Sequence, residues 1–144
     1  MEHICRSALV HFTAQQMFDL VDDIESYQTF VPYCESSKVI ERNTSQVIGQ
    51  LKVAKSGVAK SFTTKNFLDA PNAIQMELVD GPFSHLSGVW TFTALSEQAC
   101  KIELDLIFEF SNKLATILFA KIFAQLMESM VSAFTERAEK VYAD

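Results

Sequence analysis

The sequence predicts an α+β fold in which consecutive antiparallel strands pack against one long helix at the end of the chain. Residues 100–110 alternate between apolar and polar side chains, which is typical of a strand with one buried and one solvated face. Residues 111–142 contain no Gly and no Pro, and their apolar side chains recur at helical spacing. Most of the expected strands follow one another without intervening helices, which favours α+β over parallel α/β.

The chain is expected to begin with one strand and two short helices. The strand covers residues 3–12, and Thr13 is a suitable N-cap for a helix over residues 14–21. A second short helix within residues 22–30 ends at Val31, because a residue that precedes proline is pushed out of the helical region.

A meander of strands is expected next, separated by segments rich in turn-forming residues. The expected strands are 36–42, 46–55, 58–68, 73–80, 86–95 and 100–110. Ser56-Gly57 is a hairpin signal between two of them, and Gly81-Pro82 breaks the pattern before residue 86. With the first strand, the sheet has about six to seven strands. The final helix can be capped by Ser111 or Asn112.

Composition indicates a single domain over residues 1–144 with a large core, since 49% of the residues are hydrophobic and 12 are Phe. The three cysteines are widely spaced, which favours free thiols in a reducing cytoplasm. The N-terminus lacks the features of a signal peptide, and no zinc-ligand spacing is present. Lys121 and Glu128 interrupt the most apolar stretch, so we expect no transmembrane segment.

The net charge of −6 argues against binding to DNA, although the charge is unevenly distributed. Residues 42–68 contain no Asp or Glu, and four lysines of this segment are candidates for partner binding: Lys52, Lys55, Lys60 and Lys65. They could dock on ribosomal RNA or an acidic partner, or they could block edge-to-edge strand pairing. Their odd spacings within each strand count against one tight patch.

No catalytic residues are expected. The only histidines are His3, His11 and His85, and no serine lies in a Gly-x-Ser-x-Gly motif. Acidic residues at 22, 23 and 25 are better explained by the ends of short helices than by acid–base chemistry. Cys34 has no neighbouring His or Lys in sequence that would lower the pKa of its thiol.

A curved sheet that closes on a long helix leaves an apolar space between them, which is the usual setting of a site for a lipophilic ligand. Large side chains are available to line this space, although ordinary core packing explains each of them equally well. The candidates are Phe30, Val31, Pro32, Phe62, Met76, Phe83, Trp90, Phe92, Phe108, Leu118, Ile122 and Met127. Residues 30–32, with Phe83 nearby, are candidates for a gate at one end.

Several local motifs, together with this order of elements, resemble one known superfamily. They are Val21-Asp22-Asp23-Ile24-Glu25-Ser26-Tyr27, Phe30-Val31-Pro32-Tyr33-Cys34, Phe62-Thr63-Thr64-Lys65-Asn66, Val79-Asp80-Gly81-Pro82-Phe83, the set Leu86, Gly88, Trp90 and Phe92, and Phe134-Arg137-Ala138-Val141-Tyr142. Over nearly the whole chain the sequence resembles the START-related helix-grip superfamily in its polyketide cyclase and dehydrase-like branch. Within this branch it is most similar to the RatA-type ribosome association toxins and the coenzyme-Q-binding proteins.

The resemblance implies a helix-grip fold and two functions that do not exclude each other. The coenzyme-Q branch implies non-enzymatic binding of ubiquinone, or another lipid, in support of respiration. The RatA branch implies binding to the large ribosomal subunit, which blocks subunit association and inhibits translation initiation, with an antitoxin as a further partner. A cyclase or aromatase-like enzyme is allowed by the superfamily but is not encouraged by these residues. No cofactor is required by any motif in this branch.

Overall fold

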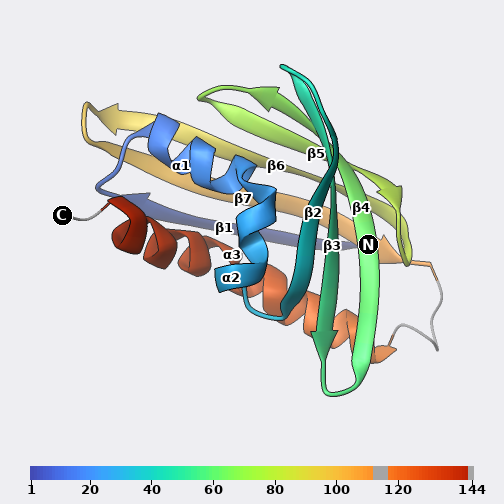
Figure 1. Ribbon diagram of the computed structural model, residues 1–144. Helices are drawn as coiled ribbons and strands as arrows, with labels where there is room; N and C mark the ends of the chain where they lie inside the picture. The colour runs from blue at the N-terminus through green and yellow to red at the C-terminus, as the bar shows by residue number, and fades with distance from the viewer. Residues whose placement is uncertain (112–116, 143–144) are drawn as a thin grey trace.

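In the computed structural model, which describes residues 1–111 and 117–142, seven strands form one antiparallel sheet (Figure 1). The strands are β1 (Glu2–Val10), β2 (Cys34–Arg42), β3 (Gln46–Lys55), β4 (Val58–Asp69), β5 (Ala73–Asp80), β6 (Phe83–Ser96) and β7 (Ala99–Phe110). The helical segments are α1 (Ala14–Asp22), the 3₁₀ turn η1 (Ile24–Ser26), α2 (Tyr27–Phe30) and α3 (Ile117–Tyr142). The predicted α+β class and order of elements are confirmed.

The spatial order of the strands is β1-β7-β6-β5-β4-β3-β2, so β2 to β7 form a meander and β1 joins its far edge. β1 runs antiparallel to β7, from the pair Glu2 and Phe108 to the pair Val10 and Cys100. The first strand therefore ends at Val10, two residues earlier than the pattern predicted.

The hairpin between β3 and β4 turns at Ser56 and Gly57, as predicted. Both residues have positive φ angles, 52° and 82° respectively. Such a two-residue turn matches the twist of the flanking strands, and glycine adopts this conformation without the clash that a Cβ atom causes.

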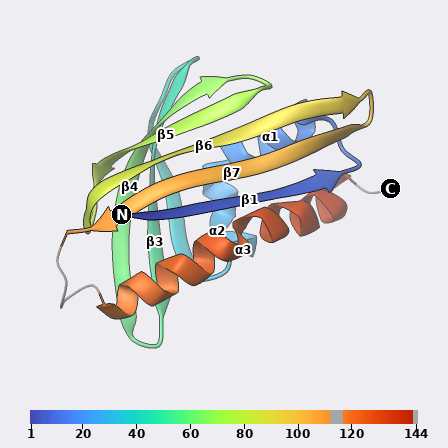
Figure 2. The ribbon, with the colours of Figure 1, turned by 180° about the vertical axis from the view of Figure 1, so that it is seen from behind.

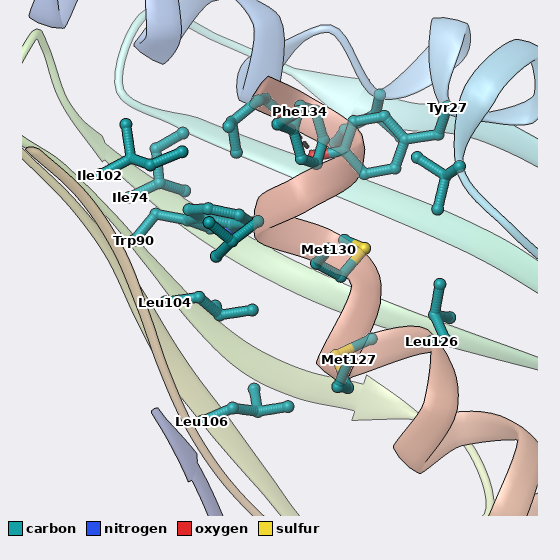
Figure 3. Packing of buried hydrophobic residues seen from close by; sticks show 14 of the residues in the cluster. Tyr27, Ile74, Trp90, Ile102, Leu104, Leu106, Leu126, Met127, Met130 and Phe134 are labelled. Carbon is teal, nitrogen blue, oxygen red and sulfur yellow. Dashed lines mark hydrogen bonds between the residues drawn. The ribbon is translucent and has the colours of Figure 1, made fainter. Parts of the chain in front are cut away.

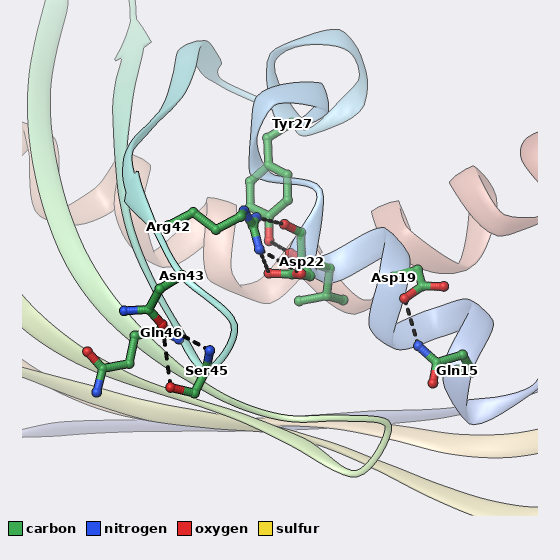
Figure 4. Close-up of polar contacts among 9 residues, drawn as sticks. Gln15, Asp19, Asp22, Tyr27, Arg42, Asn43, Ser45 and Gln46 are labelled. Carbon is green, nitrogen blue, oxygen red and sulfur yellow. Dashed lines mark hydrogen bonds and ion pairs between the residues drawn. The ribbon is translucent and has the colours of Figure 1, made fainter.

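The two short helices close one end of the sheet. Thr13 and Gln16 form a reciprocal capping box that starts α1. The segment predicted as one second helix consists of η1, which continues directly into α2, and Asp23, whose dihedral angles are non-helical, separates it from α1. At the end of α1, Arg42 of β2 donates hydrogen bonds to both carboxylate oxygens of Asp22, at 3.0 and 3.2 Å (Figure 4). This ion pair ties the helical layer to an edge strand.

The long helix α3 lies across the concave face of the sheet, and the sheet curves around it (Figures 1 and 2). Its buried side chains recur at helical spacing and include Phe119, Phe123, Leu126 and Phe134. By length and composition α3 could span a membrane, but half of its most apolar window is buried in the protein. It is therefore the core helix. The cap predicted at Ser111 or Asn112 depends on residues 112–116, which lie outside the described residues, so it stays a prediction.

Candidate functional site

A small cavity lies between α3 and the concave face of the sheet, next to η1 and α2. Its volume is about 60 Å³, and it is partly enclosed. Its walls come from η1, α2, β3 to β7 and α3, and Figure 3 shows the packing around it. The bordering residues are Ile24, Tyr27, Gly49, Leu51, Phe62, Thr64, Asn66, Met76, Leu86, Trp90, Leu104, Leu106, Phe123, Met127 and Met130.

The cavity exists because alternate strand residues and one helical stripe face each other across it. Side chains two positions apart in a strand lie on the same face, so Leu104 and Leu106 of β7 point together towards α3 (Figure 3). From the opposite side, Met127 and Met130 of α3 project towards the sheet (Figure 3). Gly49 allows η1 to approach β3 closely, because a Cβ atom at this position would lie 2.7 Å from Cδ1 of Ile24.

The polar groups at the cavity wall are already hydrogen-bonded. The hydroxyl of Thr64 donates to Oδ1 of Asn66 at 2.9 Å. The hydroxyl of Tyr27 donates to the carbonyl oxygen of Val21, and burial raises the pKa of Tyr27. Tyr27 therefore stays neutral at physiological pH. Among the described residues, the lining contains no carboxylate, amine, imidazole or thiol, so the cavity is suited to holding an apolar molecule and poorly suited to proton transfer.

At about 60 Å³ the cavity holds only a few water molecules in this conformation, since one water requires roughly 10–15 Å³ on this measure. A quinone ring needs more space. Three of the bordering side chains are methionines: Met76, Met127 and Met130. Methionine is unbranched and flexible, so rotation of these side chains can widen the cavity without moving the backbone.

Four of the twelve predicted lining residues border this cavity: Phe62, Met76, Trp90 and Met127. They come from four different elements, β4, β5, β6 and α3, which meet around the hollow. Contact between these residues and a ligand stays a prediction.

Four other candidates are buried in the core beside the cavity. Phe83 and Phe108 pack on the ring of Phe123, with centroid distances of 4.9 and 5.0 Å. Phe92 stacks on Trp90 and meets Phe18 of α1. These rings, like the buried Ile122, fill space rather than border it. Strand alternation and helical period predict which face is buried, but they do not predict where packing leaves a gap.

The proposed gate is corrected by the structure. Phe30 packs on Phe134 at 5.1 Å, and the guanidinium of Arg137 lies 5.1 Å from the centre of its ring. Val31 is buried and Pro32 half-buried, and neither borders the cavity. Phe83 of β6 packs against the first turns of α3, on the rings of Phe119 and Phe123. Eleven residues of helix, roughly 16 Å, separate Phe123 from Phe134, so Phe30 and Phe83 do not form one gate.

The prediction for Leu118 is wrong, because 60% of its surface is exposed. It lies about 100° around the helix from the buried Phe119 and falls outside the stripe that meets the sheet.

Most of the missed lining residues are small, polar or part of long alternating strands. Thr64 and Asn66 share a strand face with Phe62, which was the available signal, but their polarity made them less obvious candidates. Leu104 and Leu106 lie in the strand whose alternation was recognised. Gly49 has no side chain, so it was not among the large apolar candidates.

The four candidate lysines of the β3–β4 hairpin are divided between its two faces. Lys52 and Lys65 lie on the face that points away from α3, because their strand neighbours Leu51 and Thr64 point into the cavity. Lys52 also pairs with Glu35 at 3.0 Å.

Lys55 and Lys60 lie on the helix-facing side of the hairpin, as the strand register requires. The amine of Lys55 lies 3.2 Å from Oε1 of Gln125 on α3 and 4.6 Å from the ring centre of Tyr33. The predicted set therefore does not form a single patch.

The candidate reactive side chains do not assemble into a catalytic site in the described part of the chain. Burial raises the pKa of the Cys34 thiol to about 11, which keeps it protonated and weakly nucleophilic. His85 shares a hydrogen bond with the hydroxyl of Ser87 at 2.9 Å. Within residues 1–111 and 117–142, no group of three or more His, Cys, Asp or Glu residues is placed to hold a metal ion.

A second hollow lies on the outer face of the sheet, beside Gln75, Glu77, Asp105 and Ile107. It is larger, at about 260 Å³, but it is also more open. Because two carboxylates border it and no second layer of the described residues covers it, it lacks the apolar enclosure that an apolar ligand needs. The inner cavity is therefore the better candidate for a ligand site.

Comparison with known proteins agrees with this geometry. Residues 10–135 match the family described as polyketide cyclase / dehydrase and lipid transport. The chain is 49% identical over 144 residues to a protein named ribosome association toxin RatA from Vibrio cholerae, with full coverage of both chains. It is 29% identical over 140 residues to the mitochondrial coenzyme Q-binding protein COQ10 homolog B of Xenopus laevis, covering 94% of this chain and 57% of that protein.

Solved structures share the fold at low sequence identity. The crystal structure of the Zhui aromatase/cyclase from Streptomyces superposes with a TM-score of 0.82 at 19% identity, covering 99% of this chain and 96% of that one. At this identity the similarity supports the helix-grip fold and no particular chemistry.

Proposed function

Since this chain belongs to the polyketide cyclase/dehydrase and lipid transport family, within the group of the RatA ribosome association toxins, we propose that it is a non-enzymatic binding protein for a hydrophobic ligand of the prenylquinone class. The observation that carries this proposal is the cavity under α3, which is lined almost entirely by apolar side chains and contains three methionines. The similarity to a coenzyme Q-binding protein supports the choice of a quinone among apolar ligands.

The described cavity wall contains no carboxylate, amine, imidazole or thiol, and its one phenol, Tyr27, already donates to Val21, which supports binding rather than turnover. Of its two polar side chains other than tyrosine, Thr64 already donates to Asn66. These two groups offer oriented polar contacts, which suit the carbonyl or methoxy oxygens of a quinone ring. The free cysteines Cys5, Cys34 and Cys100 fit a protein that works in the reducing cytoplasm.

Extraction of the purified protein tests the proposal. Protein purified without detergent should release a prenylquinone or a related lipid into organic solvent, detected by mass spectrometry at a substantial fraction of one equivalent. Replacement of Leu51 by Phe narrows the cavity and should lower this yield, whereas Leu51→Met keeps a similar volume and should retain it. Extracts that match those of an unrelated apolar protein would refute the proposal.

A second candidate function is association with the ribosome, and one observation favours it: full-length similarity, at 49% identity, to a protein named for that activity. In this reading the surface of the protein, and not its cavity, carries the function. The lysines of the β3–β4 hairpin are the candidates for contact with ribosomal RNA.

Co-sedimentation with purified large ribosomal subunits over a range of salt concentrations tests this candidate. The division of the lysines between two faces allows a sharper design than reversal of all four. The pair Lys55→Glu and Lys60→Glu changes the helix-facing side, and the pair Lys52→Glu and Lys65→Glu changes the outer side. Loss of binding with only one pair would locate the contact, and salt-independent binding or none would refute an electrostatic contact. An antitoxin partner stays a prediction.

A further inference from the structure

One end of the molecule combines exposed aliphatic side chains with lysines. We call it the basic apolar surface and define it as Lys55, Lys60, Ile117, Leu118 and Lys121. Ile117 and Leu118 open α3, and 51% and 60% of their surfaces are exposed. Figures 1 and 2 show the first turns of α3 beside the tip of the β3–β4 hairpin.

Lys121 lies close to these aliphatic side chains, and Lys55 contacts the same face of α3 two turns beyond Ile117. Lys121 is one helical turn, about 5.4 Å, beyond Ile117 on the same exposed face, and Gln125 is one turn further. The amine of Lys55 lies 3.2 Å from the side chain of Gln125, so the hairpin tip lies against the exposed face of α3 that carries Lys121. Lys60 lies on the same face of the hairpin as Lys55.

Carboxylates are scarce in the two segments that form this surface. β3 and β4 contain no Asp or Glu before Asp69, and α3 contains none before Glu128. Glu128 is paired with Arg6 of β1 at 2.6 Å. The local charge is thus positive in a chain whose net charge is −6.

We propose that the basic apolar surface docks the protein on an anionic lipid membrane. Lysines near an anionic membrane are attracted to it, with an effect of about fivefold in binding for each, and aliphatic side chains gain by entering the boundary of the acyl chains. Nucleic acid fits this surface less well. Proteins hold single-stranded RNA largely by stacking bases on aromatic rings, and isoleucine and leucine side chains gain little free energy from contact with phosphates. The described part of this surface offers two aliphatic side chains, and the one aromatic ring beside it, Tyr33, is already covered by the amine of Lys55 at 4.6 Å.

The surface adjoins the cavity, and in this respect the inference deepens the proposed lipid-binding function on which it rests. Leu51, which borders the cavity, lies four positions from Lys55 along β3, or roughly 13 Å, and its partner Phe62 lies two positions from Lys60 along β4. Phe123, which also borders it, follows Lys121 by two residues on α3. Docking therefore places the cavity close to the membrane from which a lipid would enter.

Vesicle co-sedimentation of the full chain tests the inference. The protein should bind vesicles of equal phosphatidylglycerol and phosphatidylcholine, and should not bind pure phosphatidylcholine. The triple variant Lys55→Glu, Lys60→Glu, Lys121→Glu should lose at least a hundredfold in binding. A charge-matched control, Lys38→Glu, Lys65→Glu, Lys101→Glu, changes lysines outside this surface and should bind as the wild type does.

A second variant removes the apolar part without changing charge. Ile117→Ser with Leu118→Ser should weaken vesicle binding at least tenfold, and since both side chains are exposed the protein should still fold. Circular dichroism of each variant confirms folding. Vesicle binding that is absent, or equally sensitive to the control triple, would overturn the inference. Lysine-dependent binding to RNA without binding to vesicles would do the same and would favour a nucleic-acid partner.

The vesicle result is separable from the proposed function. If the protein contains a quinone but ignores anionic vesicles, only the docking inference fails. If it binds vesicles through this surface and neither contains nor accepts an apolar ligand, the docking stands and the proposed function fails.

Discussion

Replacing Met127 by alanine should lower the stability of the protein and, at the same time, raise its affinity for an apolar ligand. The side chain of Met127 is buried and borders the cavity. The substitution removes three heavy atoms, which corresponds to about 2.4 kcal/mol at roughly 0.8 kcal/mol for each buried methylene-sized group. This value lies at the low end of the usual range of about 2–5 kcal/mol, because one side of Met127 already faces empty space.

The gain in affinity follows from the size of the cavity. At about 60 Å³ it must widen before a quinone ring enters, and rotation of Met127 is one way to widen it. Holding a side chain away from its preferred rotamer costs about 0.5–1.5 kcal/mol. Deleting the side chain removes this cost, so Met127→Ala should bind a short-chain ubiquinone analogue about two- to tenfold more tightly.

Urea denaturation measures the first effect, and titration with the quinone analogue measures the second. The matched control is Met127→Leu, which keeps a similar volume and should cost less than about 1.5 kcal/mol with little change in affinity. If Met127→Ala is destabilised as expected but binds the analogue no better than the wild type, the ligand does not enter beside Met127 and the account of the cavity is wrong.

Three further predictions concern the packing of the core. Phe123→Ala should lower the free energy of unfolding by about 3–5 kcal/mol, measured by urea denaturation, because this fully buried ring packs on several others; a loss below 1 kcal/mol would contradict the packing. Gly88→Ala should cost about 1–3 kcal/mol in the same assay, because a Cβ atom there would lie 2.9 Å from the backbone oxygen of Asp105, and no side-chain rotation relieves this clash. For Cys34, burial raises the pKa from 9.0 to about 11, so its contribution to stability is complete below pH 9 and is lost as the pH rises towards 11. The urea midpoint should therefore fall less between pH 8 and pH 10.5 in Cys34→Ala than in the wild type, and equal falls would contradict the assignment.

The fold could be predicted because its main determinants are periodic and local. Alternation in residues 100–110 marked β7, the Ser56-Gly57 turn marked the β3–β4 hairpin, and the uninterrupted helical period marked α3. Each signal depends on which face of an element is buried, and a sequence records this directly. The division of the second helical segment into η1 and α2 was missed, because the dihedral angles stay helical from Ser26 to Tyr27 and only the hydrogen-bond pattern changes there.

The cavity was harder to predict than the fold. Phe108 and Leu106 lie two residues apart on the same face of β7, yet only Leu106 borders the hollow, because the ring of Phe123 covers Phe108. Which inward side chain meets a partner and which meets a gap depends on packing between elements that are distant in sequence. Leu118 shows the same limit on a helix, where a shift of one position separates core from surface.

The surface showed a similar division. The lysine-rich hairpin without acidic residues was visible in the sequence. The strand register, however, places Lys52 and Lys65 on one face of the hairpin and Lys55 and Lys60 on the other, so the four lysines do not form one binding surface. The contribution of α3 to the same end of the molecule, through Lys121, could only be seen in three dimensions.

The most direct test of the central claim uses Trp90, the only tryptophan of the chain, which borders the cavity. A short-chain ubiquinone analogue is titrated into the protein while the fluorescence of Trp90 is recorded. We expect quenching that saturates near one equivalent and is weakened in Leu51→Phe but not in Leu51→Met. Quenching that stays linear in quinone concentration and matches that of free tryptophan would show that no quinone enters beneath α3.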